Sequence, residues 1–144
     1  MSEPLAVAAK NLAEEFSTAG VRDRLDFLLE FSDNLAPLPQ RYLDHPDLLE
    51  RVEECQAPVF LFTEVEDGVV STFFSAPEEA PTTRGFAGIL HELLNLRSVE
   101  EVLAFSEDFP DTLGLAEAVS PLRLRGMRAM LHRLKRQVHE KNAA

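Results

Sequence analysis

Cysteine is almost missing from this sequence, since Cys55 is the only one in 144 residues. A single thiol cannot close a disulfide within the chain, and it excludes a zinc or iron–sulfur site that needs several cysteines from one chain. A protein with so little cysteine fits a reducing cytoplasm. We therefore expect a cytoplasmic protein without a disulfide framework.

Long apolar runs are missing as well. No run approaches the roughly 18 residues that a membrane-spanning helix requires. Residues 1–5 lack the basic region and long apolar core of a signal peptide. The net charge of −11 argues against nucleic acid, which binds basic surfaces. Neither a membrane nor a nucleic acid is therefore expected as a partner.

Positive charge is scarce over most of the chain. Residues 121–144 hold seven of the 14 Lys and Arg but only one of the 25 acidic residues, so they carry about +6 and the remainder about −17. One interpretation is a solvated basic face on the last helix. The other is a polarised surface for one protein partner, because charge complementarity steers encounters.

The apolar residues that are present, 45% of the chain, follow helical spacing in several stretches. The length fits one domain over residues 1–144. A turn of helix is also expected near 47–50 and another at 109–115. Longer helices are predicted over residues 4–17, 21–34, 83–95, 98–105 and 120–139.

Two apolar, β-rich runs at 59–65 and 69–75 flank Glu66-Asp67-Gly68. Asp-Gly between such runs predicts a hairpin. A third strand near 49–53 would place Cys55 at the tip between two neighbouring strands. The prediction is therefore an α+β fold, in which helices cover a small antiparallel sheet of about three strands.

Familiar metal and catalytic motifs fail. His91-Glu92-Leu93-Leu94-Asn95 resembles a zinc-binding helix, but Asn95 stands where the second histidine is needed. The four histidines do not form a ligand cluster by spacing. A hydrolase that uses Cys55 would need a histidine brought near by the fold. Ser98 and Glu101 fit a capping box, with Glu101 reaching back to the helix start.

The neighbourhood of Cys55 is the most informative stretch. A charged run leads into it, and an apolar strand begins after Ala57 and Pro58. Loops carried by rigid elements often hold reactive groups. A lone cysteine, however, is most often a small buried apolar residue. The acidic neighbours Glu53 and Glu54 disfavour a thiolate.

With Cys55 in this context, the sequence resembles the SufE family of sulfur acceptor proteins over nearly its whole length. Four segments match in family order: residues 35–39 (LAPLP), 52–60 (VEECQAPVF), 84–90 (RGFAGIL), and 113–115 (LGL) followed by 120–130 (SPLRLRGMRAM). The family motif for the last segment is matched at Ser120, Pro121, Arg123, Gly126, Ala129 and Met130.

Several residues depart from the family pattern. Glu54 stands where the family has a glycine before the cysteine, Ala57 replaces a serine and Phe60 a tryptophan. If that glycine has a positive φ, Glu54 is expected to be strained there.

The resemblance implies a SufE/NifU-like fold and a role as partner of SufS, a cysteine desulfurase, in iron–sulfur cluster assembly. Cys55 would accept sulfur as a persulfide, and the protein would stimulate the desulfurase and pass sulfur to a scaffold. The sequence leaves open whether the free protein buries or exposes Cys55. Arg123 is the candidate thiolate stabiliser, or else it only faces solvent at a helix start. No cofactor is expected on the chain, and the expected oligomeric state is a monomer or a weak homodimer.

Candidate partner-binding residues are Glu54, Gln56, Glu79, Arg84 and Gly85, although Gly85 could serve only close packing. The alternative is a non-catalytic, acidic protein-interaction module with a structural or redox-sensitive cysteine. Accessibility of the thiol separates these two functions.

Overall fold

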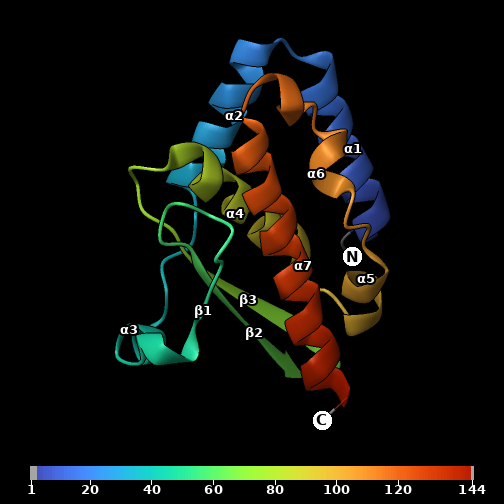
Figure 1. Cartoon of the computed structure of the whole chain (residues 1–144). Helices are drawn as coiled ribbons and strands as arrows, with labels where there is room; N and C mark the ends of the chain where they lie inside the picture. Colours follow the sequence, from blue (N-terminus) through green and yellow to red (C-terminus); the bar gives the residue numbers. More distant parts are fainter. Residues whose placement is uncertain (1–2, 144) are drawn as a thin grey trace.

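The computed structural model describes residues 3–143, so residues 1, 2 and 144 of the predicted domain lie outside it. Its fold is α+β, as predicted. Three antiparallel strands stand in the order β1-β2-β3: β1 (Glu50–Arg51), β2 (Phe60–Glu66) and β3 (Val69–Ser75). Helices pack mainly on one face of this sheet, and the long C-terminal helix crosses the front of the molecule (Figure 1).

The β2–β3 hairpin forms as the sequence predicts. Asp67 and Gly68 have φ values of 53° and 76°, which are the positive values that a tight two-residue hairpin turn requires. The register pairs Thr63 with Thr72 and Leu61 with Phe74. These residues share one face, and all of them are buried.

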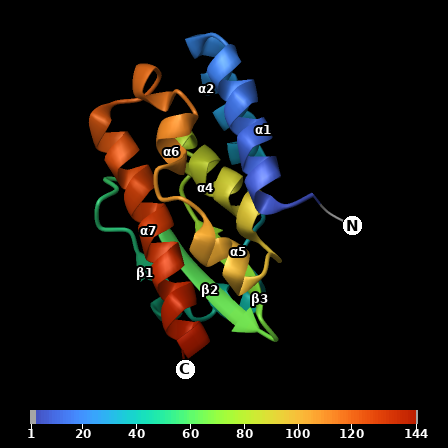
Figure 2. The ribbon, with the colours of Figure 1, turned by 90° about the vertical axis from the view of Figure 1, so that its right-hand side faces the viewer.

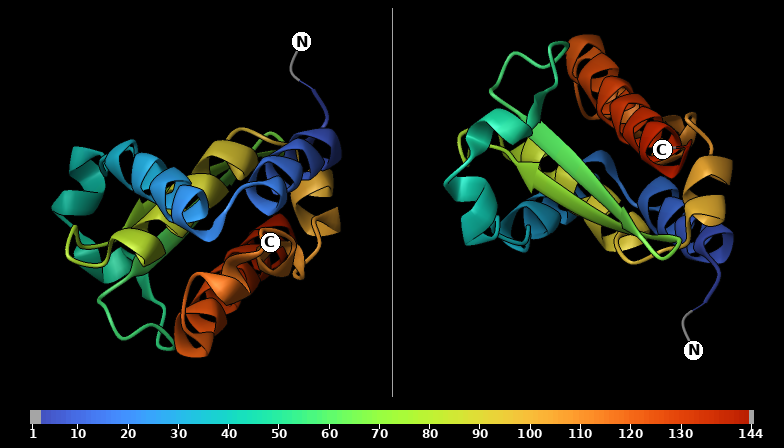
Figure 3. Two further views of the ribbon diagram at one scale, coloured as in Figure 1. Left: turned by 90° about the horizontal axis from the view of Figure 1, so that it is seen from above. Right: turned by 90° about the horizontal axis from the view of Figure 1, so that it is seen from below.

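Helices α4 (Pro81–Leu94) and α7 (Pro121–Ala143) cover that buried face. The amide and hydroxyl of Thr63 both donate to Oε1 of Gln137 on α7, at 2.8 and 3.0 Å. The amide of Thr72 donates to Oδ1 of Asn95, just after α4, and its hydroxyl lies 2.8 Å from Nδ1 of His91. The failed zinc motif therefore ties α4 to the sheet. Figure 3 shows α7 along the β2 side and α4 behind the sheet.

The outer layer begins with α1 (Leu5–Thr18) and α2 (Val21–Asp33), which pack beyond α4 (Figure 2). α2 and α4 approach unusually closely. A Cβ on Gly85 would lie 2.2 Å from the carbonyl oxygen of Leu28, and one on Gly88 would lie 2.5 Å from that of Phe31. The remaining elements are short: α3 (Gln40–Leu43), η1 (Pro46–Leu48), α5 (Val99–Ala104), α6 (Phe109–Thr112) and η2 (Leu115–Glu117).

Some boundaries and one contact differ from the predictions. The third strand has only two residues, α4 begins at Pro81, and α7 continues to Ala143. Ser98 caps α5 by accepting from the amide of Glu101, but the Glu101 carboxylate accepts from the amide of Leu5 at 2.9 Å instead of reaching back. Among residues 3–143, no helix is long and apolar enough to cross a membrane.

Candidate functional site

Cys55 lies in the connection between β1 and β2, as predicted. The base of this loop is closed where the amide of Val52 donates to the carbonyl of Val59 at 2.9 Å, and both valines are fully buried. Within the loop, the amide of Cys55 donates to the carbonyl of Val52 at 3.1 Å. The sheet and two buried side chains therefore position a short loop with the thiol near its middle.

The sequence leaves open whether the thiol is buried or exposed, and the structure shows it buried, with only 8% of the Cys55 surface accessible. Its sulfur packs against α7 at Gly126, where an added Cβ would lie 2.8 Å from Sγ. Glycine is needed there because real Cβ atoms do not approach so closely. The loop folds inward onto the helix, so the thiol fills a space that α7 leaves open.

Burial raises the pKa of the Cys55 thiol to about 11, and the neighbouring Glu54 carboxylate adds to this. The guanidinium groups of Arg133 and Arg51 act in the opposite direction. The thiol is consequently protonated near neutral pH. A protonated, buried thiol is a poor nucleophile.

Glu54 is tied to α7 by an ion pair. Its Oε1 lies 2.8 Å from Nη2 and 3.0 Å from Nε of Arg133. Among residues 3–143, the only non-glycine residues with positive φ are Asp67 and Leu96, so the condition under which Glu54 would be strained is not met. Partial burial would raise the pKa of Glu54, but hydrogen bonds from its own backbone and from Arg133 outweigh that and lower it.

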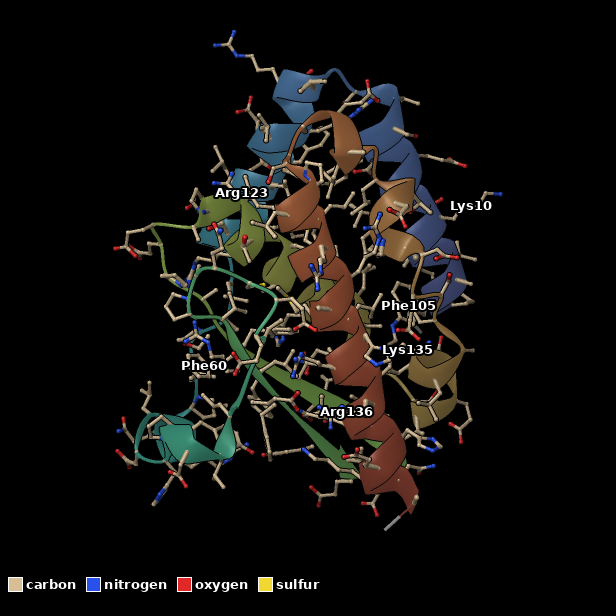
Figure 4. All side chains as sticks on the ribbon, viewed as in Figure 1. Lys10, Phe60, Phe105, Arg123, Lys135 and Arg136 are labelled. Atoms are coloured by element: carbon tan, nitrogen blue, oxygen red, sulfur yellow. The ribbon has the colours of Figure 1, made fainter. Side chains whose placement is uncertain are left out.

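A hollow of about 110 Å³ opens beside the thiol. The first turns of α4 and α7 both contribute to it, which brings together segments far apart in the sequence. Figure 4 shows Arg123 at this end of α7, whereas Arg136 lies farther along the same helix. The lining residues are Cys55, Gln56, Ala57, Glu79, Ala80, Thr83, Leu122, Arg123 and Gly126.

The hollow brings together four of the predicted site residues: Cys55, Gln56, Glu79 and Arg123. Arg84 and Gly85 do not line it. Arg84 donates to the carbonyl oxygens of Ser32 at 3.0 Å and Ala76 at 2.6 Å, and Gly85 is buried against α2. Both serve the packing of α4 in this structure.

Two neighbours of the thiol, Gly126 and Arg133, are not among the site residues predicted from the sequence. Gly126 belongs to the matched motif, and a glycine inside a helix is itself a signal of close packing. Arg133 looked like one of several basic residues near the helix end, because its partners Glu50 and Glu54 are more than 70 positions away. Nothing local marks such a pair.

The surroundings of the thiol limit the chemistry it can perform. No histidine of the described chain lines the hollow, and residues 3–143 contain no group of three His, Cys, Asp or Glu side chains arranged to hold a metal ion. The site offers one thiol, a nearby cation and two helix starts. It suits a sulfur exchange more than a hydrolysis that requires a general base.

Comparison with known proteins agrees with the sequence motifs. Residues 10–138 match the model of SufE, an Fe-S metabolism associated domain. The chain belongs to the SufE family. An uncharacterized SufE-like protein of Mycobacterium tuberculosis is 44% identical over 143 residues, covering 97% of this chain and 99% of that protein. SufE family membership implies a role in iron–sulfur metabolism.

Two further relatives extend the comparison. SufE-like protein 1, chloroplastic/mitochondrial, of Arabidopsis thaliana is 32% identical over 106 residues, which is 72% of this chain and 27% of that longer protein. A solution structure of a hypothetical protein from Thermus thermophilus is 40% identical, covers 94% of this chain and 96% of its own, and superposes with a TM-score of 0.80. The fold is therefore shared with a solved relative.

Proposed function

We propose that this SufE-family protein accepts sulfur on Cys55 from a SufS-type cysteine desulfurase, stimulates that enzyme, and passes the sulfur on to an iron–sulfur scaffold in the cytoplasm. The observation that carries the proposal is the lone thiol at the centre of a loop anchored at its base, beside an open hollow. One domain spanning residues 1–144 suffices for this role. No cofactor of its own is required.

The transfer is a thiol–persulfide exchange. The Cys55 thiolate attacks the outer sulfur of a cysteine persulfide on the desulfurase. That sulfur–sulfur bond breaks as a new one forms on Cys55, and the desulfurase cysteine leaves as a thiolate that can take up the proton lost by Cys55. Electrons and atoms balance without an external oxidant. With no second cysteine in the chain, the persulfide cannot collapse into an internal disulfide.

Arg123 is the proposed stabiliser of the anionic sulfur. It lines the hollow at the first turn of α7, where Ser120 caps the helix by accepting from the Arg123 amide at 3.2 Å. In the inward position of the thiol, Arg133 and Arg51 are the cations that lower the Cys55 pKa. Arg123 would therefore act on a thiolate or persulfide that has moved into the hollow. Unchanged sulfur transfer by Arg123→Ala would remove it from the mechanism.

Docking is proposed over the face that surrounds the hollow. Gln56 and Glu79 are exposed there, and Leu122 is 44% exposed beside them. A partner on this face would reach Cys55 only if the loop moved outward. The inward thiol thus avoids stray oxidation until the desulfurase arrives.

The test is intact-mass spectrometry after incubation with a cysteine desulfurase, pyridoxal phosphate and cysteine. We expect a gain of one sulfur atom that a thiol reductant reverses, and no gain in Cys55→Ser. No gain beside a demonstrably active, matched desulfurase would favour the second candidate, a non-catalytic interaction module. The burial of Cys55 is the observation that favours this second function.

A further inference from the structure

Arg133 contacts two carboxylates that lie on either side of a turn in the chain. From α7, its Nη1 lies 2.7 Å from Oε2 of Glu50 in β1, while its Nε and Nη2 reach Oε1 of Glu54 at 3.0 and 2.8 Å. Glu54 immediately precedes Cys55. One guanidinium therefore joins the helix, the strand before the loop, and the loop beside the thiol.

This contact is better placed to hold the loop than an ordinary surface pair. The side chains of Arg133, Glu50 and Glu54 are 22%, 25% and 31% exposed. Charge-assisted hydrogen bonds that are partly shielded from water are stronger than fully exposed ion pairs. Glu50 stays paired without Arg133, because Arg136 and Gln137 also donate to it.

The loop has few other polar attachments. Within the described chain, every hydrogen bond or ion pair that connects residues 53–58 to anything beyond the β1–β2 segment runs from Glu54 to Arg133. Its other attachments are apolar: Cys55, which contacts Gly126, and Ala57, which packs against the core. The Glu54–Arg133 pair is thus the polar contact that opposes outward movement of the loop.

We infer that Arg133 is a positioning residue and that the Glu54–Arg133 pair is a latch that keeps Cys55 inward until a partner displaces it. The inference rests on the proposed sulfur-accepting role of Cys55. The latch needs the glutamate at position 54, where the motif that the sequence resembles has a glycine.

Two possible roles of Arg133 predict opposite changes in the reactivity of Cys55 when Arg133 is removed, so the direction of the change tests the inference. The charged groups that face Cys55 are Glu54, Arg51 and Arg133, with Arg123 and Glu79 across the hollow. If Arg133 acted only as a nearby cation, its loss would disfavour the thiolate, and Cys55 would be alkylated more slowly. If it is a latch, its loss lets the loop swing outward, so the thiol becomes solvated and is alkylated faster.

The experiment measures the alkylation rate of Cys55 by iodoacetamide from pH 7 to pH 10 in the isolated protein. Arg133→Met and Glu54→Ala are expected to react roughly threefold to tenfold faster than the unmodified chain, with the pH profile shifted downward. Arg133→Lys keeps a cation that can pair with Glu54 and should restore most of the protection. The double variant, Arg133→Met with Glu54→Ala, should be alkylated no faster than the faster of the two single variants, because both substitutions remove the same contact.

Arg128→Met is the matched control, since Arg128 is also on α7 and pairs with Asp111, which is not a residue of the loop. It should alkylate at the unmodified rate, and circular dichroism should show every variant folded. An Arg133→Met protein that alkylates at the same rate or more slowly overturns the latch, and Arg133→Gln provides a second reading of the same sign should Arg133→Met fail to fold. Glu54→Ala cannot replace it, because loss of the Glu54 charge alone lowers the Cys55 pKa and speeds alkylation. The alkylation assay contains no desulfurase, so a result against the latch would not bear on whether Cys55 accepts sulfur.

Discussion

At the scale of single residues, the behaviour of Cys55 follows from what touches its sulfur. Gly126 leaves the space that the thiol fills, and burial there keeps the thiol protonated. A buried thiol is protected but slow, so any change that moves it outward exchanges protection for reactivity. Two predictions concern this balance.

The first prediction is that Gly126→Ala pushes the thiol out of its site. The new Cβ would lie 2.8 Å from Sγ, which is too close for the sulfur to remain. We expect faster alkylation of Cys55 and a downward shift of its pH profile. Alanine favours the helix by about 1 kcal/mol relative to glycine, which offsets part of the lost packing. Gly20→Ala is the control, because a Cβ at Gly20 meets nothing within 4 Å. An unchanged alkylation rate would contradict the prediction.

The second prediction concerns stability at high pH. Burial raises the pKa of Cys55 from an ordinary 9.0 to about 11, so the folded state holds the thiol proton more tightly than the unfolded state. The stabilisation from a raised pKa is present below pH 9 and is lost as the pH rises towards 11. Relative to Cys55→Ala, the protein should lose roughly 2 to 3 kcal/mol of unfolding free energy over that range. Urea denaturation at each pH measures the unfolding free energy, and a free energy that changes with pH in the same way in both proteins would rule this out.

At the scale of elements, α2 and α4 approach each other closely enough for their backbones to touch. Gly85 and Gly88 on α4 face the backbone of Leu28 and Phe31, so the two helices touch main chain to main chain. Arg84 strengthens the contact by donating to the carbonyl of Ser32. The start of α4 lines the hollow near Cys55, so this packing fixes one wall of the site.

The third prediction follows from that contact. Gly85→Ala would place a Cβ 2.2 Å from the carbonyl oxygen of Leu28, and backbone cannot yield as a flexible side chain does. We expect a loss of about 3 kcal/mol in unfolding free energy, which is at the upper end for overpacking. Thermal unfolding measures it, with Gly20→Ala again as the control. A fully stable Gly85→Ala variant that transfers sulfur poorly would instead support the docking role predicted for Gly85.

Local patterns were enough to predict most elements but not how they meet. The Asp67-Gly68 turn, the Ser98 cap and the helix at Pro121 follow from neighbouring residues, and the structure confirms them. The two-residue β1 is too short to have a pattern of its own. The contact of Glu101 with Leu5 spans 96 positions, and no local rule could distinguish it from a closed capping box.

At the site, likewise, the sequence motif predicts which residues matter but not how they are arranged in space. The family motif located Cys55, Gln56 and Arg123, and the fold brings all three to one hollow. The sequence left the orientation of the thiol open because it depends on tertiary contacts of the loop with Gly126 and Arg133. The charged neighbour Glu54 ties the loop to α7 through its pair with Arg133.

At the scale of the whole molecule, the basic segment at residues 121–144 is largely used internally. Within the described chain, Arg128, Arg133 and Arg136 pair with carboxylates of other segments, while Lys135 and Lys141 donate to backbone carbonyls. These pairs mean that the segment is more than a solvated basic face, while its role as a surface for a protein partner stays a prediction. Arg123 and Arg125 make no ion pair among residues 3–143, and both lie at the end of α7 near the loop.

Glu50 is the centre of this internal pairing and leads to the last prediction. It accepts from Arg133, Arg136 and Gln137, and so joins β1 to α7. Burial would raise the Glu50 pKa, but these donors outweigh it and hold the pKa below the ordinary 4.5. A carboxyl with a lowered pKa stabilises the fold above its ordinary value, and this stabilisation is lost as the pH falls through the folded-state value.

Glu50→Gln should therefore cost about 2 kcal/mol of unfolding free energy at pH 7, and the difference from the unmodified protein should shrink as the pH falls from 5 to 3. Denaturant unfolding at each pH measures both curves. Glu66→Gln is the control, because Glu66 is exposed and belongs to no ion pair within residues 3–143. A difference that stays constant down to pH 3 would mean that Glu50 stabilises the protein by its shape and hydrogen bonds and not by its charge. α7 would then be held to β1 by contacts that acid does not break.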